Sequence, residues 1–113
     1  MVAYFKGMDM DSVFRALADK SRRALLDRLF EKNGQTLSEL TEGLGMTRQA
    51  VSKHLAILEE ASLVATLKRG REKLHYLNPI PIAEITVRWI GKYEHAQVEA
   101  LLGLKDQLEK PDE

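Results

Sequence analysis

Residues 45–55, GMTRQAVSKHL, carry polar side chains along one face of a predicted helix. At 100° per residue, one arc of about 140° contains Arg48, Gln49, Ser52, Lys53 and Ala56. Arginine can bond O6 and N7 of guanine, glutamine can pair with adenine, and hydroxyl groups can bond phosphate or base. Together with the residue that precedes the helix, the predicted DNA-binding set is Thr47, Arg48, Gln49, Ser52 and Lys53.

Every amphipathic helix has a polar face, so simple solvation is the alternative interpretation of this arc. A solvated helix commonly alternates glutamate with lysine, yet no acidic residue occurs between Thr47 and Leu58. The nearest carboxylates, Glu59 and Glu60, come only at the far end. The helix N-terminus adds a partial positive charge and free amides. The composition of this face therefore favours contact with phosphates and bases.

The elements before this helix are predicted from caps and apolar spacing. Asp9 or Asp11 can begin a first helix, in which the apolar residues at helical spacing are Val13, Phe14, Leu17 and Ala18. Asp19 begins a second helix that continues to about Lys32, and Asn33–Gly34 ends it. The inner stripe of the second helix is predicted to contain Leu25, Leu26, Leu29 and Phe30.

A helix-turn-helix unit follows. Thr36 and Glu39 have the spacing of a capping box, which predicts a brief helix that ends at GLG, residues 43–45. Thr47 caps the next helix, which runs to about Ala61. Its predicted buried residues are Val51, Leu55 and Leu58. Two helices joined by a short glycine-containing turn have the form of a helix-turn-helix motif.

From residue 64 to residue 77 the apolar period changes to two, with a turn at Gly70–Arg71, which predicts a β-hairpin. Residues 64–75 contain four basic residues and one acidic residue. An exposed turn that happens to be basic is the simpler interpretation of the hairpin alone. Next to the preceding helix, it is predicted to lie along a DNA backbone. Its predicted contacts are Lys68, Arg69, Arg71 and Lys73, of which Arg69 and Arg71 are the strongest candidates.

Pro79 and Pro81 end the second strand and can begin a helix, so a long final helix is expected from about residue 82 to residue 108. Its apolar stripe contains Ile82, Ile85, Trp89, Tyr93, Ala96, Ala100, Leu104 and Leu108. Its first half, around Ile85 and Trp89, is expected to pack on its own subunit. The whole stripe is longer than so small a domain can cover, which favours a homodimer. The predicted interface residues are Val13, Phe14, Leu17, Ile85, Trp89, Tyr93, Ala96 and Leu104.

The 113 residues, with 44% hydrophobic and 30% charged residues, fit one globular domain. We expect a mainly helical α+β fold of the order α-α-α-α-β-β-α, with a core and hairpin in residues 9–78 and a dimerisation helix in residues 82–108. The net charge is zero, so a nucleic acid must be recognised by a local patch. From Glu94 onward six acidic residues face two lysines, which indicates an acidic tail kept away from that patch.

Several classes of protein are excluded. The chain has no cysteine, so it has no disulfide and no thiolate ligand. The first residues lack the features of a signal peptide, and no stretch approaches the ~20 apolar residues of a membrane span, so a cytoplasmic protein is expected. Three scattered histidines without a glycine-rich phosphate loop make no catalytic arrangement. Neither an enzyme nor a cofactor is predicted.

Three segments together resemble the ArsR-type winged helix-turn-helix repressors. These segments are VFRALADKSRRALLDRLF, LSELTEGLGMTRQAVSKHLAILEEASLV and RGREKLHYLNP, which cover residues 13–30, 37–64 and 69–79. The resemblance includes the junction from Ala18 to Arg23, the SKHL segment and the hairpin, and it is looser in the last helix. It implies a homodimeric regulator of a palindromic operator that often represses its own operon. Within the family, the chain resembles a cysteine-free branch.

The resemblance also raises metal sensing as an alternative. The family's cysteine-based site cannot exist here. A second family site, on the last helix, would have to use Glu84, His95 and Glu99, with Thr86 where a histidine is needed. That site is incomplete, so no metal ligand is assigned. A non-cysteine site at His95 and Glu99, completed by the partner subunit, stays an alternative.

The other two histidines have simpler interpretations. His54 falls beside the buried arc near Ala50 and Leu58, so it is predicted to pack or to cap. His75, on the second strand, is predicted to be solvated or close to a phosphate. A winged-helix module that binds protein is the remaining alternative function. The carboxylate-free helix face and the basic hairpin favour DNA over that alternative.

Overall fold

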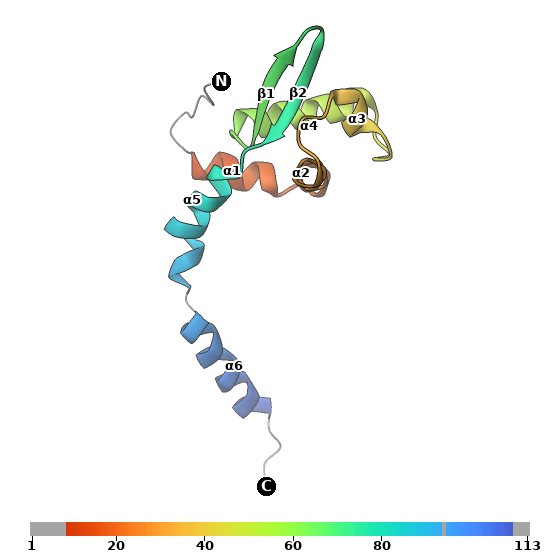
Figure 1. The fold of residues 1–113 in the computed structure, drawn as a ribbon. Coiled ribbons are helices and arrows are strands. Elements are labelled where there is room, and N and C mark those ends of the chain that lie inside the picture. The colour runs from red at the N-terminus through yellow and green to blue at the C-terminus, as the bar shows by residue number, and fades with distance from the viewer. Residues whose placement is uncertain (1–8, 94, 110–113) are drawn as a thin grey trace. The chain divides into compact units, whose positions relative to one another are not determined.

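A computed structural model of the chain describes residues 9–93 and 95–109. Two compact units are present, one up to Ile82 and one from Ala83. The elements of the first unit are α1 (Met10–Leu17), α2 (Lys20–Glu31), α3 (Leu37–Thr41), α4 (Arg48–Glu60), β1 (Val64–Arg69) and β2 (Glu72–Leu77). After them come α5 (Ile80–Arg88), which begins in the first unit, η1 (Ile90–Lys92) and α6 (His95–Glu109). Figure 1 shows this order, which confirms the predicted mainly helical fold with a β-hairpin.

Helices α1 to α4 begin at caps that the sequence predicts. The Asp9 carboxylate accepts from the amide of Asp11 at 3.1 Å, and the Asp19 carboxylate accepts from the amide of Ser21 at 2.8 Å. The Thr36 hydroxyl accepts from the amide of Glu39 at 3.2 Å, and the Glu39 carboxylate accepts from the Thr36 amide at 3.1 Å. These bonds satisfy first-turn amides that have no partner inside the helix.

The core of the first unit surrounds α4, which contacts α1, α2, α3 and β1. The largest fully buried side chains of this unit include Leu25, Leu29, Leu40, Leu58 and Leu63. Phe30, predicted to belong to the inner stripe of α2, is instead 79% exposed, so that prediction is wrong. Leu25, Leu26 and Leu29 define the buried arc of α2, and Phe30 lies about 90° from its centre at 100° per residue.

The β1–β2 hairpin, here called the wing, projects from the helices of the first unit (Figure 1). Its antiparallel register pairs Val64 with Leu77 and Arg69 with Glu72. Gly70 at the tip has a φ of +62°, a left-handed conformation that glycine adopts without a steric penalty. The base of the wing is buried through Val64 and Leu74, while its tip is exposed. The strand pairing therefore holds a basic tip away from the core.

The second unit contradicts the single helix predicted for residues 82–108. The α-helix ends at Arg88, a short 3-10 turn follows, and α6 begins only at His95. The backbone closes tightly at the break, where a Cβ on Gly91 would lie 2.8 Å from the carbonyl oxygen of Thr86. The Lys92 ammonium lies close to two aromatic rings, 5.6 Å from the ring centre of Trp89 and 5.3 Å from the ring centre of Tyr93. Glycine at position 91 therefore permits a turn that a residue with a Cβ atom would obstruct.

No described helix combines the length and the apolar character that crossing a lipid bilayer requires.

Candidate nucleic-acid interface

The predicted DNA-binding residues of α4 lie together on its exposed face. Thr47, Arg48, Gln49, Ser52 and Lys53 are all exposed, while Val51, Leu55 and Leu58 are buried on the opposite side. The hydroxyl of Thr47 caps α4 by accepting from the amide of Ala50 at 3.1 Å, and its own hydrogen stays available as a donor. The turn before α4 contains Gly45 with a φ of +69°. The turn and cap therefore fix the orientation of the polar face.

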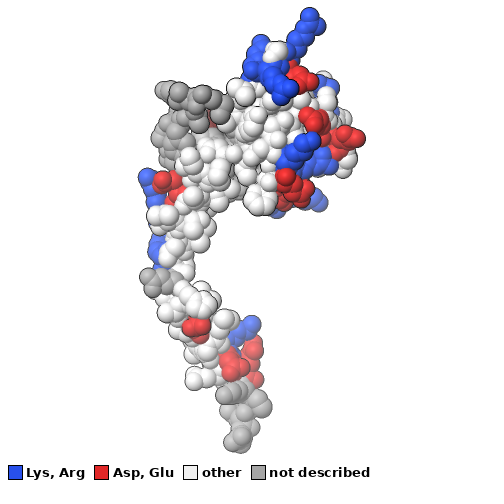
Figure 2. Space-filling view, in the orientation of Figure 1, with Lys and Arg blue, Asp and Glu red and all other residues white. Residues whose placement is uncertain are grey.

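The wing supplies a second group of cations. Lys68, Arg69, Arg71 and Lys73 are all exposed, and Figure 2 shows basic side chains gathered at the tip of the hairpin. Glu72 is the one acidic residue within the strands of this hairpin. The Nζ atom of Lys73 lies 3.2 Å from Oε1 of Glu59 at the end of α4. Lys73 thus joins the wing to α4 as well as adding charge.

The other cations of these two elements make no such pair. Within the described residues, no ion pair involves Arg48, Lys53, Lys68, Arg69 or Arg71. Unpaired cations on one surface attract a polyanion, because phosphates can replace their counterions. The surface formed by the face of α4 and the wing is therefore electrostatically suited to a nucleic acid.

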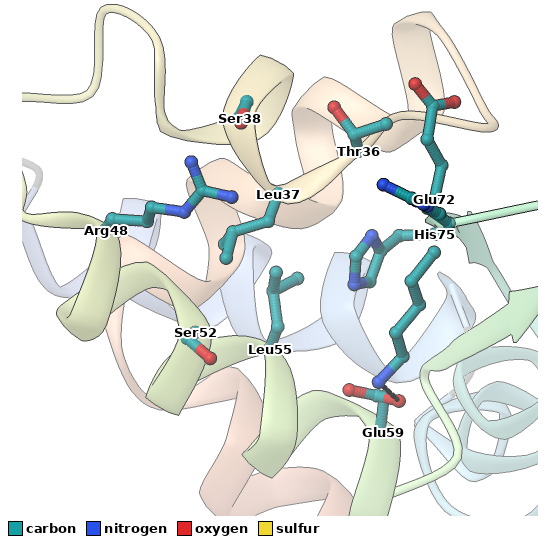
Figure 3. A pocket seen from close by; sticks show the side chains of 11 residues that line it. Thr36, Leu37, Ser38, Arg48, Ser52, Leu55, Glu59, Glu72 and His75 are labelled. Carbon is teal, nitrogen blue, oxygen red and sulfur yellow. Dashed lines mark ion pairs between the residues drawn. The ribbon is translucent and has the colours of Figure 1, made fainter. Parts of the chain in front are cut away.

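A pocket of about 420 Å³ lies between α3, α4 and the wing (Figure 3). It is called the α4–wing pocket here, and it is lined by Thr36, Leu37, Ser38, Arg48, Ser52, Leu55, Glu59, Arg71, Glu72, Lys73 and His75. Leu37 and Leu55 give it an apolar part, and the hydroxyl and basic side chains give it donors. No pattern in the sequence indicated this pocket, because its residues come from segments separated by up to 39 positions.

His75 is buried at 3% exposure, so the prediction that it is solvated is wrong. Its backbone amide donates to the carbonyl oxygen of Gln35 at 2.8 Å, and its ring Nδ1 lies 2.9 Å from the same oxygen. The Gln35 side chain donates to the carbonyls of Lys32 and Arg28, at 2.6 and 3.1 Å. This connection holds β2 against the loop between α2 and α3. The prediction that His75 is near a phosphate stays open.

His54 is half-buried, as predicted for a packed or capping residue. Its Nδ1 lies 3.4 Å from Nη1 of Arg22. The same arginine donates from Nε to the carbonyl of Ala16 at 2.8 Å and from Nη2 to the carbonyl of Arg15 at 3.0 Å. Arg22 therefore ends α1 and links it to α4 through His54. These contacts keep His54 away from the exposed face.

Three carboxylates have lowered pKa values because they accept hydrogen bonds at helix starts. The hydroxyl and amide of Ser12 lower the pKa of Asp9. The amide of Arg22, followed by that of Ser21, lowers the pKa of Asp19. The amide and hydroxyl of Thr36 lower the pKa of Glu39. These charged forms stabilise helix ends and do not form a reactive centre.

The alternative metal site at the last helix is not assembled within the described residues. Nε2 of His95 lies 2.9 Å from Oε1 of Glu99. No group of three or more metal-binding side chains occurs in residues 9–93 and 95–109. A pair on one exposed helix is a weak site unless other ligands complete it.

The predicted dimer residues divide into two groups. Val13 and Ile85 are 1% and 2% exposed, so both are buried within their own chain, and their assignment to an interface stays a prediction. For Ile85, packing within its own chain was expected. Leu17 is half-buried, and the other predicted residues, Phe14, Trp89, Tyr93, Ala96 and Leu104, are exposed. Hydrophobic spacing alone does not distinguish a helix face covered by its own subunit from one covered by another.

Comparisons with known proteins agree with this geometry. A family model described as a helix-turn-helix domain matches residues 17–66. The chain is 41% identical over 86 residues to the uncharacterized HTH-type transcriptional regulator YuzN of Bacillus subtilis, covering 71% of this chain and 94% of that protein. It is 27% identical over 81 residues to the transcriptional repressor SdpR of the same organism, covering 72% and 88%.

Solved structures give the same result. An ArsR-like transcriptional regulator from Rhodococcus sp. RHA1 is 30% identical, with a TM-score of 0.66 over 91% of this chain and 94% of that chain. A second one, the ArsR family transcriptional regulator RHA00566, is 30% identical, with a TM-score of 0.61 over 88% of each chain. Both likenesses extend beyond the helix-turn-helix segment.

Proposed function

Because this chain belongs to the ArsR family of winged helix-turn-helix transcriptional regulators, we propose that it acts as a homodimer that binds a palindromic operator. It would repress its own or a neighbouring operon in the cytoplasm. The family consists of DNA-binding regulators and not of enzymes. The single observation that carries the proposal is the set of exposed cations without ion pairs on α4 and the wing, namely Arg48, Lys53, Lys68, Arg69 and Arg71.

The two elements would have different tasks. An α-helix fits the major groove, where Arg48 and Gln49 can bond base edges and Ser52 can bond phosphate or base. The wing would lie along the backbone, with Arg69 and Arg71 on phosphates or in the minor groove. Lys73 would contribute less, because Glu59 already neutralises it at 3.2 Å.

The second unit supports the dimer. α6 has no buried residue, although Leu101, Leu104 and Leu108 are 65%, 52% and 78% exposed. An apolar surface of this extent is typical of one that meets a partner chain. A second copy would cover it by two-fold symmetry, which is the common way for soluble chains to assemble. Residues 9–78 would then bind DNA, and residues 82–108 would join the subunits.

A two-fold dimer would present two copies of α4 about 34 Å apart, one DNA turn, in successive major grooves. Each subunit makes few phosphate contacts, so affinity would depend on both. The operator would therefore have two inverted half-sites.

The test is selection of duplexes from a random pool, followed by measurement of affinity for the selected and a random duplex as salt is raised. We expect tighter binding to the selected duplex than to the random one. The affinity for both duplexes should fall as the salt concentration rises, with a log–log slope near 0.9 in magnitude for each neutralised phosphate. A protein-interaction module, the alternative function, would select no sequence and would show no dependence on duplex length. That result would refute DNA regulation by this chain.

A further inference from the structure

The α4–wing pocket is lined in part by His75, which has no role in the proposed function. We propose that this pocket binds one phosphate group of the DNA backbone and that His75 takes up a proton from the solvent when it does. The inference rests on the proposed function and adds a specific contact to it. It follows from the burial of His75, from the bond at one of its ring nitrogens and from the position of the pocket.

The bond to Gln35 fixes which nitrogen of His75 carries hydrogen. Nδ1 lies 2.9 Å from the carbonyl oxygen of Gln35, and a carbonyl oxygen only accepts. The hydrogen of the neutral ring must therefore be on Nδ1, and Nε2 then carries a lone pair. Nε2 has no hydrogen-bond partner within the described residues. In the same part of the chain, every polar side-chain atom that is fully buried has a hydrogen-bond partner, so an atom without a partner is not fully buried. Nε2 therefore keeps access to solvent, and His75 lines the pocket.

A neutral His75 cannot donate a hydrogen bond into the pocket, because the ring's hydrogen already bonds Gln35. An anion next to Nε2 would face a lone pair until the ring is protonated, after which both nitrogens donate. Histidine is the side chain that ordinarily changes charge between about pH 5 and pH 8. Binding of a phosphate and binding of a proton should therefore favour each other by linkage.

The charges around the ring agree with an anion as the occupant. Arg48 from α4 and Arg71 from the wing line the pocket and are not in an ion pair within the described chain, and Figure 3 shows the Arg48 side chain directed toward the same space as the His75 ring. Glu59 is neutralised by Lys73, and Glu72 is exposed near the tip. α3 contributes no titratable side chain to the lining. The Glu39 carboxylate is bonded to Thr36 and lies 3.9 Å from Lys32.

The position of the pocket favours the DNA backbone as the source of the phosphate. Its lining includes Arg48 and Ser52 from the proposed reading face and Arg71 from the wing. A strand that contacts both elements must pass the opening between them. Leu37 and Leu55 provide apolar contact for the carbons of a deoxyribose, and Ser38 and Ser52 provide hydroxyl donors. A free phosphate has the same donors available but no sugar to fill the apolar part.

The experiment measures proton uptake and pH-dependent affinity with the full chain and a selected duplex. Calorimetry in two buffers of different ionisation enthalpy should show net proton uptake when the duplex binds. At constant ionic strength, the affinity of the dimer for the duplex should fall as the pH is raised, because each bound dimer holds two additional protons. Absence of proton uptake by the unmodified protein would overturn the proposal without any variant.

Two substitutions test the roles of the two ring nitrogens of His75 separately. His75→Asn keeps a donor for the Gln35 carbonyl but removes the group that faces the pocket, so it should bind DNA more weakly and lose most of the pH dependence. His75→Gln places an amide near the position of Nε2 and should bind with little pH dependence. Glu31→Gln, an exposed change at the end of α2, is the control and should behave like the unmodified protein. Equal pH dependence in all four proteins would contradict the role of His75.

Inorganic phosphate, added to the protein without DNA, tests whether a free phosphate ion can occupy the pocket. NMR signals of the His75 ring should move on addition of the duplex and should stay in place with millimolar phosphate at constant ionic strength. A shift with millimolar phosphate would assign the pocket to a free anion and overturn the DNA assignment. Salt-dependent, sequence-selective binding with no contribution from His75 would refute this inference alone. Absence of sequence-selective duplex binding would refute the proposed function and this inference together.

Discussion

Lys73 on β2 and Glu59 at the end of α4 form an ion pair, with 3.2 Å between Nζ and Oε1. This pair joins the wing to the helix that is proposed to read DNA. It also divides the basic residues of the wing into two kinds. Arg71 has a charge that no described carboxylate neutralises, whereas the charge of Lys73 is already balanced.

Arg71 and Lys73 should contribute unequally to the salt dependence of DNA binding, because only Lys73 is in an ion pair within the described residues. Arg71→Gln should weaken binding to all duplexes alike and should lower the log–log salt slope by about 0.9 for each subunit of the bound dimer, because each subunit loses one phosphate contact. Lys73→Gln should lower the slope by less, since Lys73 must first leave Glu59. Salt titrations of both variants on one random duplex measure the difference. A larger change for Lys73→Gln than for Arg71→Gln would contradict this division.

The second prediction concerns base recognition by α4. Arg48→Ala or Gln49→Ala should cost about 1–3 kcal/mol on the selected duplex and less on a random one, because bidentate contacts to bases are lost. Competition between the two duplexes measures the change in preference. Lys20→Ala, an exposed change on α2, is the control and should alter neither affinity. Equal losses on both duplexes for Arg48→Ala would refute its role as a reader.

The third prediction concerns the dimer. Trp89 and Leu104 are 42% and 52% exposed, so Trp89→Gln with Leu104→Gln should weaken self-association without opening the core. Ile85 is unsuitable for this test because it is buried. Analytical ultracentrifugation and duplex binding should show loss of the dimer and of operator affinity together. A monomeric variant with full affinity would overturn the coupling of dimerisation to binding.

The fourth prediction concerns acid stability. Asp19 has a pKa below its ordinary value of 3.8, chiefly because the Arg22 amide donates to it. Its charged form therefore stabilises the folded chain above about pH 4, and this stabilisation is lost as the pH falls through the lower, folded pKa. Asp19→Asn keeps a capping oxygen but cannot titrate. Its unfolding should depend less on pH in this range, and an unchanged acid branch of the stability curve would contradict the role of Asp19.

The sequence predicted those parts of the fold that depend on local signals. Caps at Asp19, Thr36 and Thr47 lie within one turn of the amides they bond, so the residue spacing is sufficient to identify them. The strands of the wing were predicted for the same reason, because alternation and the Gly70 turn are local.

Long-range contacts were not predictable in this way. Nothing in the hairpin pattern indicates that Gln35, 40 positions away, bonds His75 and buries it. The break between α5 and α6 depends on a backbone contact at Gly91 that the apolar stripe conceals. The burial of Val13 depends on how helices distant in sequence pack together, which the spacing of one helix does not specify.

The most direct test of the account is the affinity of the protein for a selected operator before and after 5 base pairs are inserted between its half-sites. Two copies of α4 held about 34 Å apart can enter successive major grooves only on one side of the duplex, and an insertion of about half a turn moves one half-site to the other side. We predict that affinity then falls to that of a single half-site. Unchanged affinity, or selected sites without two-fold symmetry, would contradict regulation by a symmetric dimer.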